Sequence, residues 1–541
     1  MNDQTALRDT DFKHAVDRIV VSGKRVFGWG WASHRTRAVK SIHLRLEGDG
    51  WQRRIPTGIG LSRDDVERAF PDHVNAGASG FVVAGHLPGP QPLKSWLDVE
   101  FDDGPGASID VTPTIEGRYT KRLRALSWVA ASVWRHLKRG DIGGIVRRAR
   151  AQSFGVLATG DVTAVREVSA ALGTARVTLV VDHNMGGGAN HYRRGIIERR
   201  LAKGEMALLC TYNLPVLEYR IHLFAPGLPE KVWAISTFMA LEPLVEEGRI
   251  GELFVNSPVS FDEPLVLAEW LARMRSENAD VRLTVTAHDY FSVCPSFVLL
   301  NAEGRFCNIP SISECEGCLA RHEASYVALS PPSAMGAWRA LWGRCLAVAD
   351  EVRCFSGASR ELLLRAYPAL DTARLTVVPH QVDFHPPRQP RSNPTAPLVI
   401  GVIGEISAQK GAHVVVDMVH EIERRGIDAR VVVLGMLHAP LRSPRLTVTG
   451  TYERAQLVDL VESHGINMLF FPSVWPETFS YVVAEMMALG LPVVAFDLGA
   501  PAERLRGYPK ARMCAEATGP AALTQLLAFQ RELAGAARPA A

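Results

Sequence analysis

The stretch that decides the fold is FFPSVWPETFSYVVAEMMALGLPVVAFDLGAP, residues 470–501. An apolar run is followed by a proline-bounded loop, a helical stretch, the turn Gly490-Leu491-Pro492 and a second apolar run. This order predicts strand, loop, helix, turn and strand in an α/β sheet. Glu477 and Glu485 stand eight apart, about two turns if one helix carries both, so we expect their side chains near one face.

The start of this helix is expected to bind a ligand. A helix N-terminus offers unpaired N–H groups and a positive dipole end, which suit a phosphate. Carboxylates there would repel phosphate, so their better targets are hydroxyl groups. A phosphate together with many hydroxyls describes a nucleotide sugar. The alternative is an ordinary βαβ unit with two surface glutamates.

The segment resembles the Glu-x7-Glu region of retaining glycosyltransferases of family 4, which have the GT-B fold. LVIGVIGEISAQKGAHVVVDMV, residues 398–419, is similar to that family's first C-domain strand, phosphate loop and helix. VVPHQVD, residues 377–383, is similar to the hinge that precedes the C-terminal domain. Together these motifs extend the resemblance over roughly residues 174–535.

The pattern along the chain fits an α/β fold of two facing Rossmann-like domains behind a small β domain. Before residue 116, short β-like runs alternate with Gly/Asp-rich turns and predict an antiparallel sandwich. From residue 174, two series of strand-like runs alternate with helical stretches, which predicts parallel sheets. The expected domains are an accessory β-sandwich (1–115), a basic helical linker (116–170), a GT-B N-terminal acceptor domain (171–392) and a GT-B C-terminal nucleotide-sugar donor domain (393–541).

The sandwich carries the motifs GWGWAS and SGF, which resemble an accessory domain fused to some bacterial glycosyltransferases. Its predicted loops hold Trp29, Trp31 and Arg63. Aromatic planes stack on sugars, so one interpretation is a sugar-binding face. The other is a core tryptophan pair beside a structural turn.

Composition limits the class of protein. A chain of 541 residues with 47% hydrophobic and 22% charged residues is typical of a globular protein of several domains. The net charge of +3 argues against a generally nucleic-acid-binding surface. The sequence has no apolar run of about eighteen residues, so no membrane span is expected. The first residues, MNDQTALRDTDFK, lack the layout of a signal peptide. A cytoplasmic location is therefore expected.

Residues 118–150 hold ten Lys and Arg residues, opposed by Asp141 alone, with Trp128 and Trp134 on an apolar face. One interpretation is an amphipathic helix that lies peripherally on an anionic membrane, at its inner face. That location would suit a lipid-linked acceptor. The other interpretation is a linker helix packed on the catalytic domains with a solvated basic face.

Three glycines, Gly186, Gly187 and Gly188, follow the first strand of the α/β region. Glycines at a strand end let backbone amides approach an anion closely, although many such loops are merely tight turns. Asn190 and Arg193 follow on the next helix and could reach into the cleft. By resemblance this loop faces the donor phosphates and the acceptor.

The resemblance also implies individual roles. His288, at the end of a strand, is expected to contact the donor sugar, and Asp289 to orient its imidazole or cap the next helix. Lys410 is expected to stabilise the leaving diphosphate, Glu477 to hold sugar hydroxyls and Glu485 to hold the ribose diol. The remaining donor-binding residues are expected to be Gly404, Thr478, Phe479, Gly187 and Gly188.

One position departs from the family's pattern. Many members carry a basic residue just after the glycine that ends the first C-domain strand, but this chain has Glu405 after Gly404. An expected cation is therefore missing. Arg193 or another basic residue compensates, or diphosphate binding is weaker, or the donor differs.

Cys294, Cys307, Cys315 and Cys318 form a C-x12-C-x7-C-x2-C pattern. The C-x2-C spacing and four thiolates suit a structural zinc site, although the other spacings fit no standard zinc finger. An iron–sulfur cluster is a weaker alternative. The remaining reading is free or oxidisable thiols.

The resemblance thus implies a retaining glycosyltransferase, expected to transfer a sugar from an NDP-sugar to a glycan or lipid-linked acceptor in cell-surface polysaccharide or glycolipid synthesis. Closure at a hinge near residues 380–396 is expected to exclude water. No metal cofactor is required for the chemistry. The alternatives are a GT-B sugar-nucleotide epimerase or hydrolase, and a non-catalytic glycan-binding protein with a degenerate cleft, which Glu405 favours.

Overall fold

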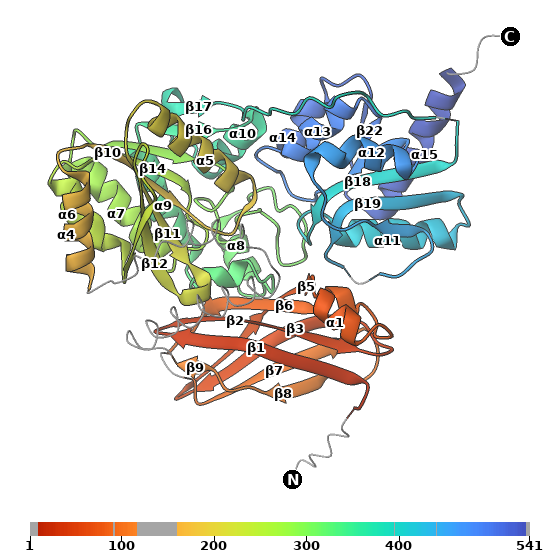
Figure 1. Cartoon of the computed structure of the whole chain (residues 1–541), viewed down its shortest axis with the longest axis horizontal. Coiled ribbons are helices and arrows are strands. Elements are labelled where there is room, and N and C mark those ends of the chain that lie inside the picture. Colours follow the sequence, from red (N-terminus) through yellow and green to blue (C-terminus); the bar gives the residue numbers. More distant parts are fainter. Residues whose placement is uncertain (1–8, 90–91, 116–159, 394, 440, 537–541) are drawn as a thin grey trace.

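The structure is a computed structural model that describes residues 9–89, 92–115, 160–393, 395–439 and 441–536. The described residues form a β-sandwich and two α/β domains (Figure 1). The basic stretch 118–150 lies outside them, so the membrane and linker interpretations both stay predictions. Among the described helices, none has the length and apolar character needed to cross a membrane.

The N-terminal domain is the predicted sandwich of two mainly antiparallel sheets. Their strand orders are β5-β6-β2-β1-β9 and β4-β3-β7-β8. The strands are β1 (Phe12–Ser22), β2 (Arg25–His34), β3 (Val39–Gly48), β4 (Trp51–Pro56), β5 (Gly58–Leu61), β6 (Gly80–His86), β7 (Lys94–Phe101), β8 (Ala107–Asp110) and β9 (Thr114–Ile115), with a short helix α1 (Asp64–Ala69) after β5.

The two tryptophans of the GWGWAS motif have partners within the protein. Trp29 packs against the core of the neighbouring α/β domain, and the Trp31 ring lies 5.7 Å from Phe70. Arg63 is paired with the carboxylates of Asp17 and Asp65. These contacts favour the structural interpretation of the motif over a sugar-binding face.

The first α/β domain has an eight-stranded sheet of order β13-β12-β11-β10-β14-β15-β16-β17. Its strands are β10 (Val177–Asp182), β11 (Ala207–Asn213), β12 (Glu218–Phe224), β13 (Lys231–Ile235), β14 (Ile250–Ser257), β15 (Arg282–Thr286), β16 (Glu351–Cys354) and β17 (Leu375–Val377). Its helices are α4 (Asp161–Leu172), α5 (Gly187–Ala202), α6 (Glu242–Glu246), α7 (Pro264–Glu277), α8 (Ile312–Leu319), α9 (Met335–Val348) and α10 (Gly357–Ala366).

This sheet is mixed, whereas the sequence pattern predicts parallel strands throughout. β12 pairs antiparallel with β11 and with β13. The connection from β11 to β12 holds only a short 3-10 turn, Leu214–Val216, which is too short for the crossover that parallel strands need. The helix α4 packs on this domain, although the predicted linker (116–170) includes all but its last two residues.

The second α/β domain has a fully parallel sheet of order β20-β19-β18-β21-β22-β23. Its strands are β18 (Leu398–Ile406), β19 (Ala429–Leu437), β20 (Leu446–Val448), β21 (Met468–Phe471), β22 (Val493–Phe496) and β23 (Ala511–Cys514). Its helices are α11 (Ala412–Arg424), α12 (Leu457–Ser463), α13 (Tyr481–Leu489), α14 (Gly499–Leu505) and α15 (Gly519–Ala536). Two separate apolar cores flank the sheet.

The two Rossmann-like domains face each other in the GT-B arrangement and share apolar contacts (Figure 1). Val298 and Leu300 come from the segment between β15 and α9, yet they are buried in the core of the second domain. Trp475 of the second domain packs against the cores of both. Apolar contacts therefore fill part of the boundary, which favours a fixed orientation of the two domains relative to each other.

The sandwich contacts both α/β domains. Buried Arg25 donates to the Leu329 carbonyl oxygen of the first domain at 2.7 Å. Arg442 of the second domain donates to the His73 carbonyl oxygen at 3.1 Å. At Gly60, an added Cβ would lie 3.2 Å from the His438 Cα. The sandwich thus lies across the boundary between the domains (Figure 1).

Two glycines test this docking because both have positive φ but different surroundings. Gly60 has φ +86° and faces His438, whereas Gly50 has φ +71° and open space. Alanine costs about 1 kcal/mol at either position through backbone strain. Only Gly60→Ala also presses on the second domain, so it should lower the melting temperature more than Gly50→Ala. Equal losses in differential scanning fluorimetry would contradict the docking contact.

Candidate functional site

In the first α/β domain, the buried carboxylate of Asp182 anchors the glycine loop. Asp182 ends β10 and is fully buried. It accepts from Asn190 Nδ2 at 2.9 Å and from Arg193 Nη1 at 2.8 Å. Asn190 Oδ1 in turn accepts the Gly186 N–H at 2.7 Å. Asn190 and Arg193 therefore support the loop, and Arg193 is already paired rather than a free cation for diphosphate.

Two of the three glycines of this loop have backbone conformations that other residues rarely adopt. Gly186 is the N-cap of α5 with φ +88°, and Gly187 follows with φ +82°. Gly188 lies against Tyr481 of the second domain, where an added Cβ would be 3.2 Å from the ring. The loop thus lies at the boundary between the two domains, as the sequence predicts.

His288 follows β15 and lies at the same boundary. Its Nε2 is 2.9 Å from Asn256 Oδ1. The Asn256 amide nitrogen donates to the Ala189 carbonyl oxygen at 2.9 Å, so Oδ1 is the acceptor and His288 Nε2 carries the proton. Burial holds the pKa of His288 well below its ordinary value, so the ring is neutral. Nδ1 is then the nitrogen that can accept from a hydroxyl.

Asp289 does not orient His288, although the sequence analysis considers that role. Its two oxygens accept from the Ser257 hydroxyl at 2.6 Å and the Phe291 N–H at 2.8 Å. It therefore fixes the turn after His288. Asn256 holds the imidazole instead, and a lone asparagine at the end of β14 gives no sequence signal for that role.

In the second domain, Lys410 and Glu477 form an ion pair with Nζ and Oε1 2.9 Å apart. Gly411 brings them together because the Lys410–Gly411 turn lies directly against the loop after β21. It has φ +83°, and an added Cβ would be 2.0 Å from the Pro472 carbonyl oxygen. Only glycine fits such an approach. The predicted Lys410-Gly411 motif thus positions the lysine against the first carboxylate.

The helix α13 carries Glu485 but not Glu477, so the two carboxylates are not on one helix. α13 begins at Tyr481, after the N-cap Ser480. Glu477 lies in the preceding loop because Pro476 and the Ser480 cap delay the helix. Glu477 is 2% exposed, and the Lys410 ammonium is its ion-pair partner, so most lone pairs of this carboxylate lack a donor among the described residues. A buried carboxylate oxygen in that state calls for a donor that a ligand could supply.

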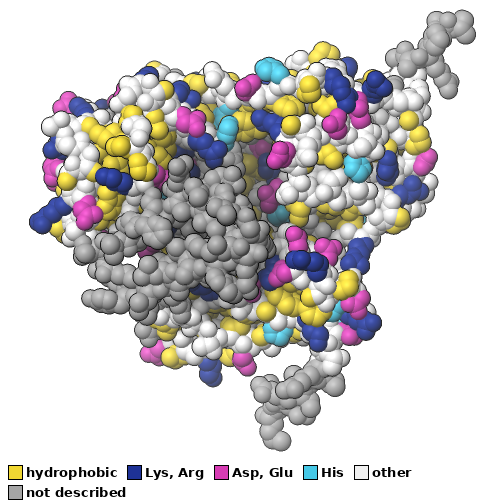
Figure 2. All heavy atoms as spheres, viewed as in Figure 1, with side chains coloured by type: hydrophobic (Ala, Val, Ile, Leu, Met, Phe, Trp, Pro, Cys, Tyr) yellow, Lys and Arg dark blue, Asp and Glu magenta, His cyan; other side chains and the backbone are white. Residues whose placement is uncertain are grey.

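Thr478 and Phe479 connect this loop to the first domain. The Thr478 hydroxyl donates to the His288 carbonyl oxygen at 2.8 Å. The Phe479 ring stacks on His380 with centroids 4.6 Å apart. His288, Thr478 and Glu477 are thereby brought together across the domain boundary. Figure 2 shows acidic, basic and His side chains close together where the two lobes meet.

Glu485 is paired with an arginine that sequence reasoning missed. Arg454 Nε and Nη2 each lie 2.6 Å from Glu485 Oε1. The same guanidinium donates to the Asp383 carbonyl oxygen at 3.3 Å and lies over Phe384. Burial raises the pKa of Glu485, and Arg454 opposes that rise. Arg454 thus connects the second carboxylate to the segment between the domains.

Glu405 pairs with His438 Nε2 at 3.1 Å and is 73% exposed. The preceding Gly404, with φ +111°, approaches α13, since an added Cβ would be 3.5 Å from Val482. The structure therefore places an acidic side chain beside the expected donor site, where many members of the resembled family carry a basic residue. The pairing lowers the pKa of Glu405, so it is ionised.

The four clustered cysteines are all unpaired thiols. Burial raises the pKa of Cys294 to about 12, and it raises those of Cys307 and Cys315. Within the described ranges, no three His, Cys, Asp or Glu side chains are placed to hold a metal ion. The geometry thus gives no support to the predicted zinc, which stays a prediction.

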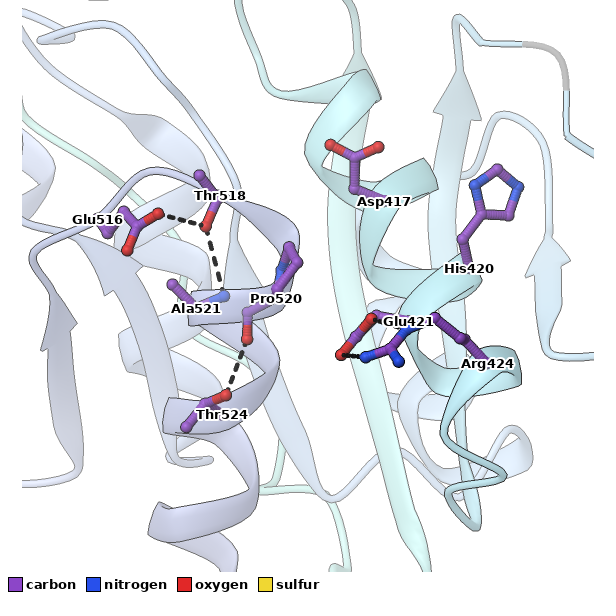
Figure 3. Close-up of a pocket in the computed structure, with 9 residues that line it drawn as sticks. All are labelled: Asp417, His420, Glu421, Arg424, Glu516, Thr518, Pro520, Ala521 and Thr524. Atoms are coloured by element: carbon purple, nitrogen blue, oxygen red, sulfur yellow. Dashed lines mark hydrogen bonds and ion pairs between the residues drawn. The ribbon is translucent and has the colours of Figure 1, made fainter.

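A separate pocket of about 620 Å³ lies between α11 and α15, on the second domain. Figure 3 shows the Glu421–Arg424 ion pair on one side and the hydrogen bonds of Thr518 and Thr524 on the other. None of the predicted site residues lines this pocket. The candidate site is therefore the domain boundary and not this surface hollow.

Comparison with protein families gives one match. Residues 397–528 match the model described as glycosyl transferases group 1. The match covers most of the second α/β domain, including Lys410, Glu477 and Glu485, and less than half of the chain. A search of curated protein sequences gave no significant match.

Several solved structures are similar at low identity. HepE of Anabaena, solved with UDP and glucose, is 15% identical, with 66% of this chain and 90% of that chain covered and a TM-score of 0.42. Sucrose-phosphate synthase of Thermosynechococcus elongatus is 16% identical, with 67% and 94% covered and a TM-score of 0.43. The lipopolysaccharide outer core galactosyltransferase WaaB is 11% identical, with 67% and 91% covered and a TM-score of 0.39.

The Lys410–Glu477 pair gives a first test of the site. Lys410→Ala should lower turnover of an NDP-sugar by on the order of 100-fold, because a charge contact to the leaving group is lost. It should also lower the melting temperature, because Glu477 is left unpaired. Lys510→Ala is the matched control, since Lys510 donates to the Gly490 carbonyl oxygen at 2.8 Å on the surface. Native turnover by folded Lys410→Ala would exclude the lysine.

The cysteine cluster gives a second test. If it binds zinc, protein purified without chelator should contain about one equivalent of metal, and Cys315→Ser with Cys318→Ser should release it and lower the melting temperature. Cys345→Ser is the control, since Cys345 is buried in the apolar core of the first domain. If elemental analysis found no zinc, the interpretation as free or oxidisable thiols would remain.

Proposed function

We propose that this protein is a retaining glycosyltransferase that transfers a sugar from an NDP-sugar to a glycan or lipid-linked acceptor. The observation that carries the proposal is Glu477, a buried carboxylate at the domain boundary whose ion pair with Lys410 leaves lone pairs open to a further donor. A sugar hydroxyl would supply that donor. The group 1 glycosyl transferase match over residues 397–528 supports the same reading.

The chemistry follows from where charge develops. Breaking the anomeric C–O bond leaves an oxocarbenium-like sugar and a diphosphate. An acceptor hydroxyl then bonds to the anomeric carbon, and its proton passes to the diphosphate. Lys410 stabilises the diphosphate from one side, and the amides before α13, near Thr478 and Phe479, stabilise it from the other. Both groups are fixed before the reaction, so little reorganisation is needed when the charge appears.

The remaining residues bind and orient. Glu477 holds hydroxyls of the donor sugar, and Glu485, fixed by Arg454, holds the ribose diol. His288 Nδ1 accepts from a sugar hydroxyl on the face that belongs to the first domain. The glycine loop lies opposite α13, where its backbone amides contact the donor phosphates and the acceptor. Retention of the anomeric configuration follows from the family resemblance and belongs to the proposal.

The acceptor and pathway are proposed on chemistry alone. Cell-surface polysaccharide and glycolipid synthesis both build on acceptors carried by membrane lipids, and the basic stretch 118–150 would place the enzyme peripherally at an anionic surface. A cytoplasmic enzyme meets NDP-sugars and such acceptors at the inner face of the membrane. No metal cofactor is part of the proposed reaction.

A donor panel tests the proposal. Purified protein should release NDP from one or a few NDP-sugars, and release should rise with a glycan or lipid-linked acceptor. An epimerase or hydrolase would consume donor equally without acceptor. A glycan-binding protein would release no NDP from any donor, and that outcome would overturn the enzyme assignment.

Glu485→Gln adds a residue-level test of the same function. An amide pairs less well with a diol than a carboxylate does, so nucleotide affinity should fall by about 10-fold or more, given roughly 1.5–3 kcal/mol for hydrogen bonds to a charged group. Glu462→Gln is the control, because Glu462 binds Arg388 and the Arg391 N–H, whereas Glu485 pairs with Arg454. Equal affinity of Glu485→Gln and wild type in calorimetry would remove Glu485 from the ribose site.

A further inference from the structure

The loop before α13 and the first residue of that helix contact the first α/β domain at three points. The Tyr290 hydroxyl donates to the Pro476 carbonyl oxygen at 2.8 Å, and the Thr478 hydroxyl donates to the His288 carbonyl oxygen at 2.8 Å. The third contact joins His380 Nδ1 and the Tyr481 hydroxyl, 2.6 Å apart. The first two involve backbone carbonyls, whereas the third is a contact between two side chains and is specific to them.

His380 is buried in a ring cluster drawn from both domains. It is 8% exposed, stacks on Phe479 at 4.6 Å and 10°, and meets Phe355 at 4.2 Å and His288 at 5.1 Å. Burial lowers the pKa of His380 to about 3, so its ring is neutral. Its Nε2 has no hydrogen-bond partner among the described residues. The Tyr481 hydroxyl is therefore the polar contact that fixes how the His380 ring is turned.

Tyr481 occupies the gap between the two phosphate-binding elements of the proposed mechanism. It is the first residue of α13, whose preceding amides face the diphosphate in that mechanism. Its ring lies against Gly188 of the glycine loop, where an added Cβ would be 3.2 Å away. The ring also meets His191 of α5 edge-on at 5.2 Å. The position of this one ring thus sets how far the glycine loop stands from α13.

We propose that His380 and Tyr481 are a positioning pair that sets the spacing between the glycine loop and the first turn of α13. The pair rests on the proposed function, because it aligns groups of the first domain with a leaving group held by the second. In the proposed mechanism, most nucleotide contacts come from Lys410, Glu485 and the amides before α13, all in the second domain, and the glycine loop adds phosphate contacts from the first. The pair therefore acts more on the rate of sugar transfer than on nucleotide affinity.

The sharpest variant is Tyr481→Phe, which keeps the ring against Gly188 and removes only the hydroxyl. We expect kcat for transfer to fall by about 10-fold to 100-fold, since small misplacements of reacting groups have effects of this order. The Kd for NDP should rise by less than kcat falls, because only the glycine-loop contacts to the phosphates are displaced. The share of donor lost to water should rise, because a looser boundary admits water.

Tyr508→Phe is the matched control. The Tyr508 hydroxyl donates to the Leu491 carbonyl oxygen at 2.9 Å within the second domain. Removing it deletes one tyrosine hydrogen bond of similar length without touching the boundary. It should leave kcat and the hydrolysed share as in the wild type. A Tyr481→Phe variant that matches Tyr508→Phe in kcat and in NDP affinity would overturn the proposal.

A double-mutant cycle separates a specific pair from two independent residues. His380→Gln keeps an acceptor near the Tyr481 hydroxyl, so it should retain more transfer activity than His380→Phe. If the two side chains act together, the variant that combines His380→Phe with Tyr481→Phe should transfer about as fast as the slower single variant. Multiplying losses in kcat would show two independent roles and would overturn the pair.

Hydrogen exchange tests the spacing without relying on enzyme activity. Tyr481→Phe should speed amide exchange in residues 187–191, and Tyr508→Phe should not. Unchanged exchange in 187–191 would refute the positioning role whatever the kinetics show. A wild type that releases no NDP from any donor would refute the proposed function, whereas this exchange result would still decide whether the pair sets the spacing.

Discussion

The two buried carboxylates of the second domain constrain the structure around them. Glu477 is 2% exposed and Glu485 is 7% exposed, and an uncompensated charge at such depth costs several kcal/mol. Each carboxylate has one cation, Lys410 for Glu477 and Arg454 for Glu485. The two cations come from segments far apart in the sequence. The turn after β18, the segment before α12 and the loop before α13 must therefore come together for either pair to form.

The boundary between the domains follows from the same requirement for partners. The N-terminus of α10, in the first domain, is capped by Glu503 of α14, whose oxygens accept the Gly357 and Ala358 N–H groups at 3.1 and 2.7 Å. Val298 and Leu300 add apolar burial on the second domain. The sandwich contacts both domains through Arg25 and Arg442. Polar, apolar and accessory contacts thus hold the glycine loop and α13 opposite each other.

The sequence predicts local order well where the cause is local. The apolar runs and turns before and after residues 472–480 predict β21, α13 and β22, and Gly411 marks the turn that brings Lys410 to Glu477. Two other local features contradict the predictions of an all-parallel sheet and of one helix that carries both glutamates. The short link after β11 excludes a parallel crossover, and the cap at Ser480 begins α13 too late to include Glu477.

The remaining misses depend on contacts between distant segments. Asn256 and His288 are 32 residues apart, and Arg454 and Glu485 are 31 apart. Neither spacing follows a helical or strand period, so no pattern in the chain indicates the pairing. Arg193 shows the opposite error. It looks like a free cation beside a glycine loop, but it is paired with Asp182, whose burial only the folded structure reveals.

The effect of Glu405 depends on the charged side chains around it. Beside the proposed donor site, Glu405, Glu477 and Glu485 face Lys410, Arg454 and His438. These three carboxylates and their partners leave a site that is not strongly positive for the diphosphate of the proposed mechanism. In the proposed mechanism, Lys410 is shared between Glu477 and the leaving group. When a sugar hydroxyl donates to Glu477, that carboxylate depends less on the ammonium, and Lys410 is free to follow the charge that builds on the diphosphate.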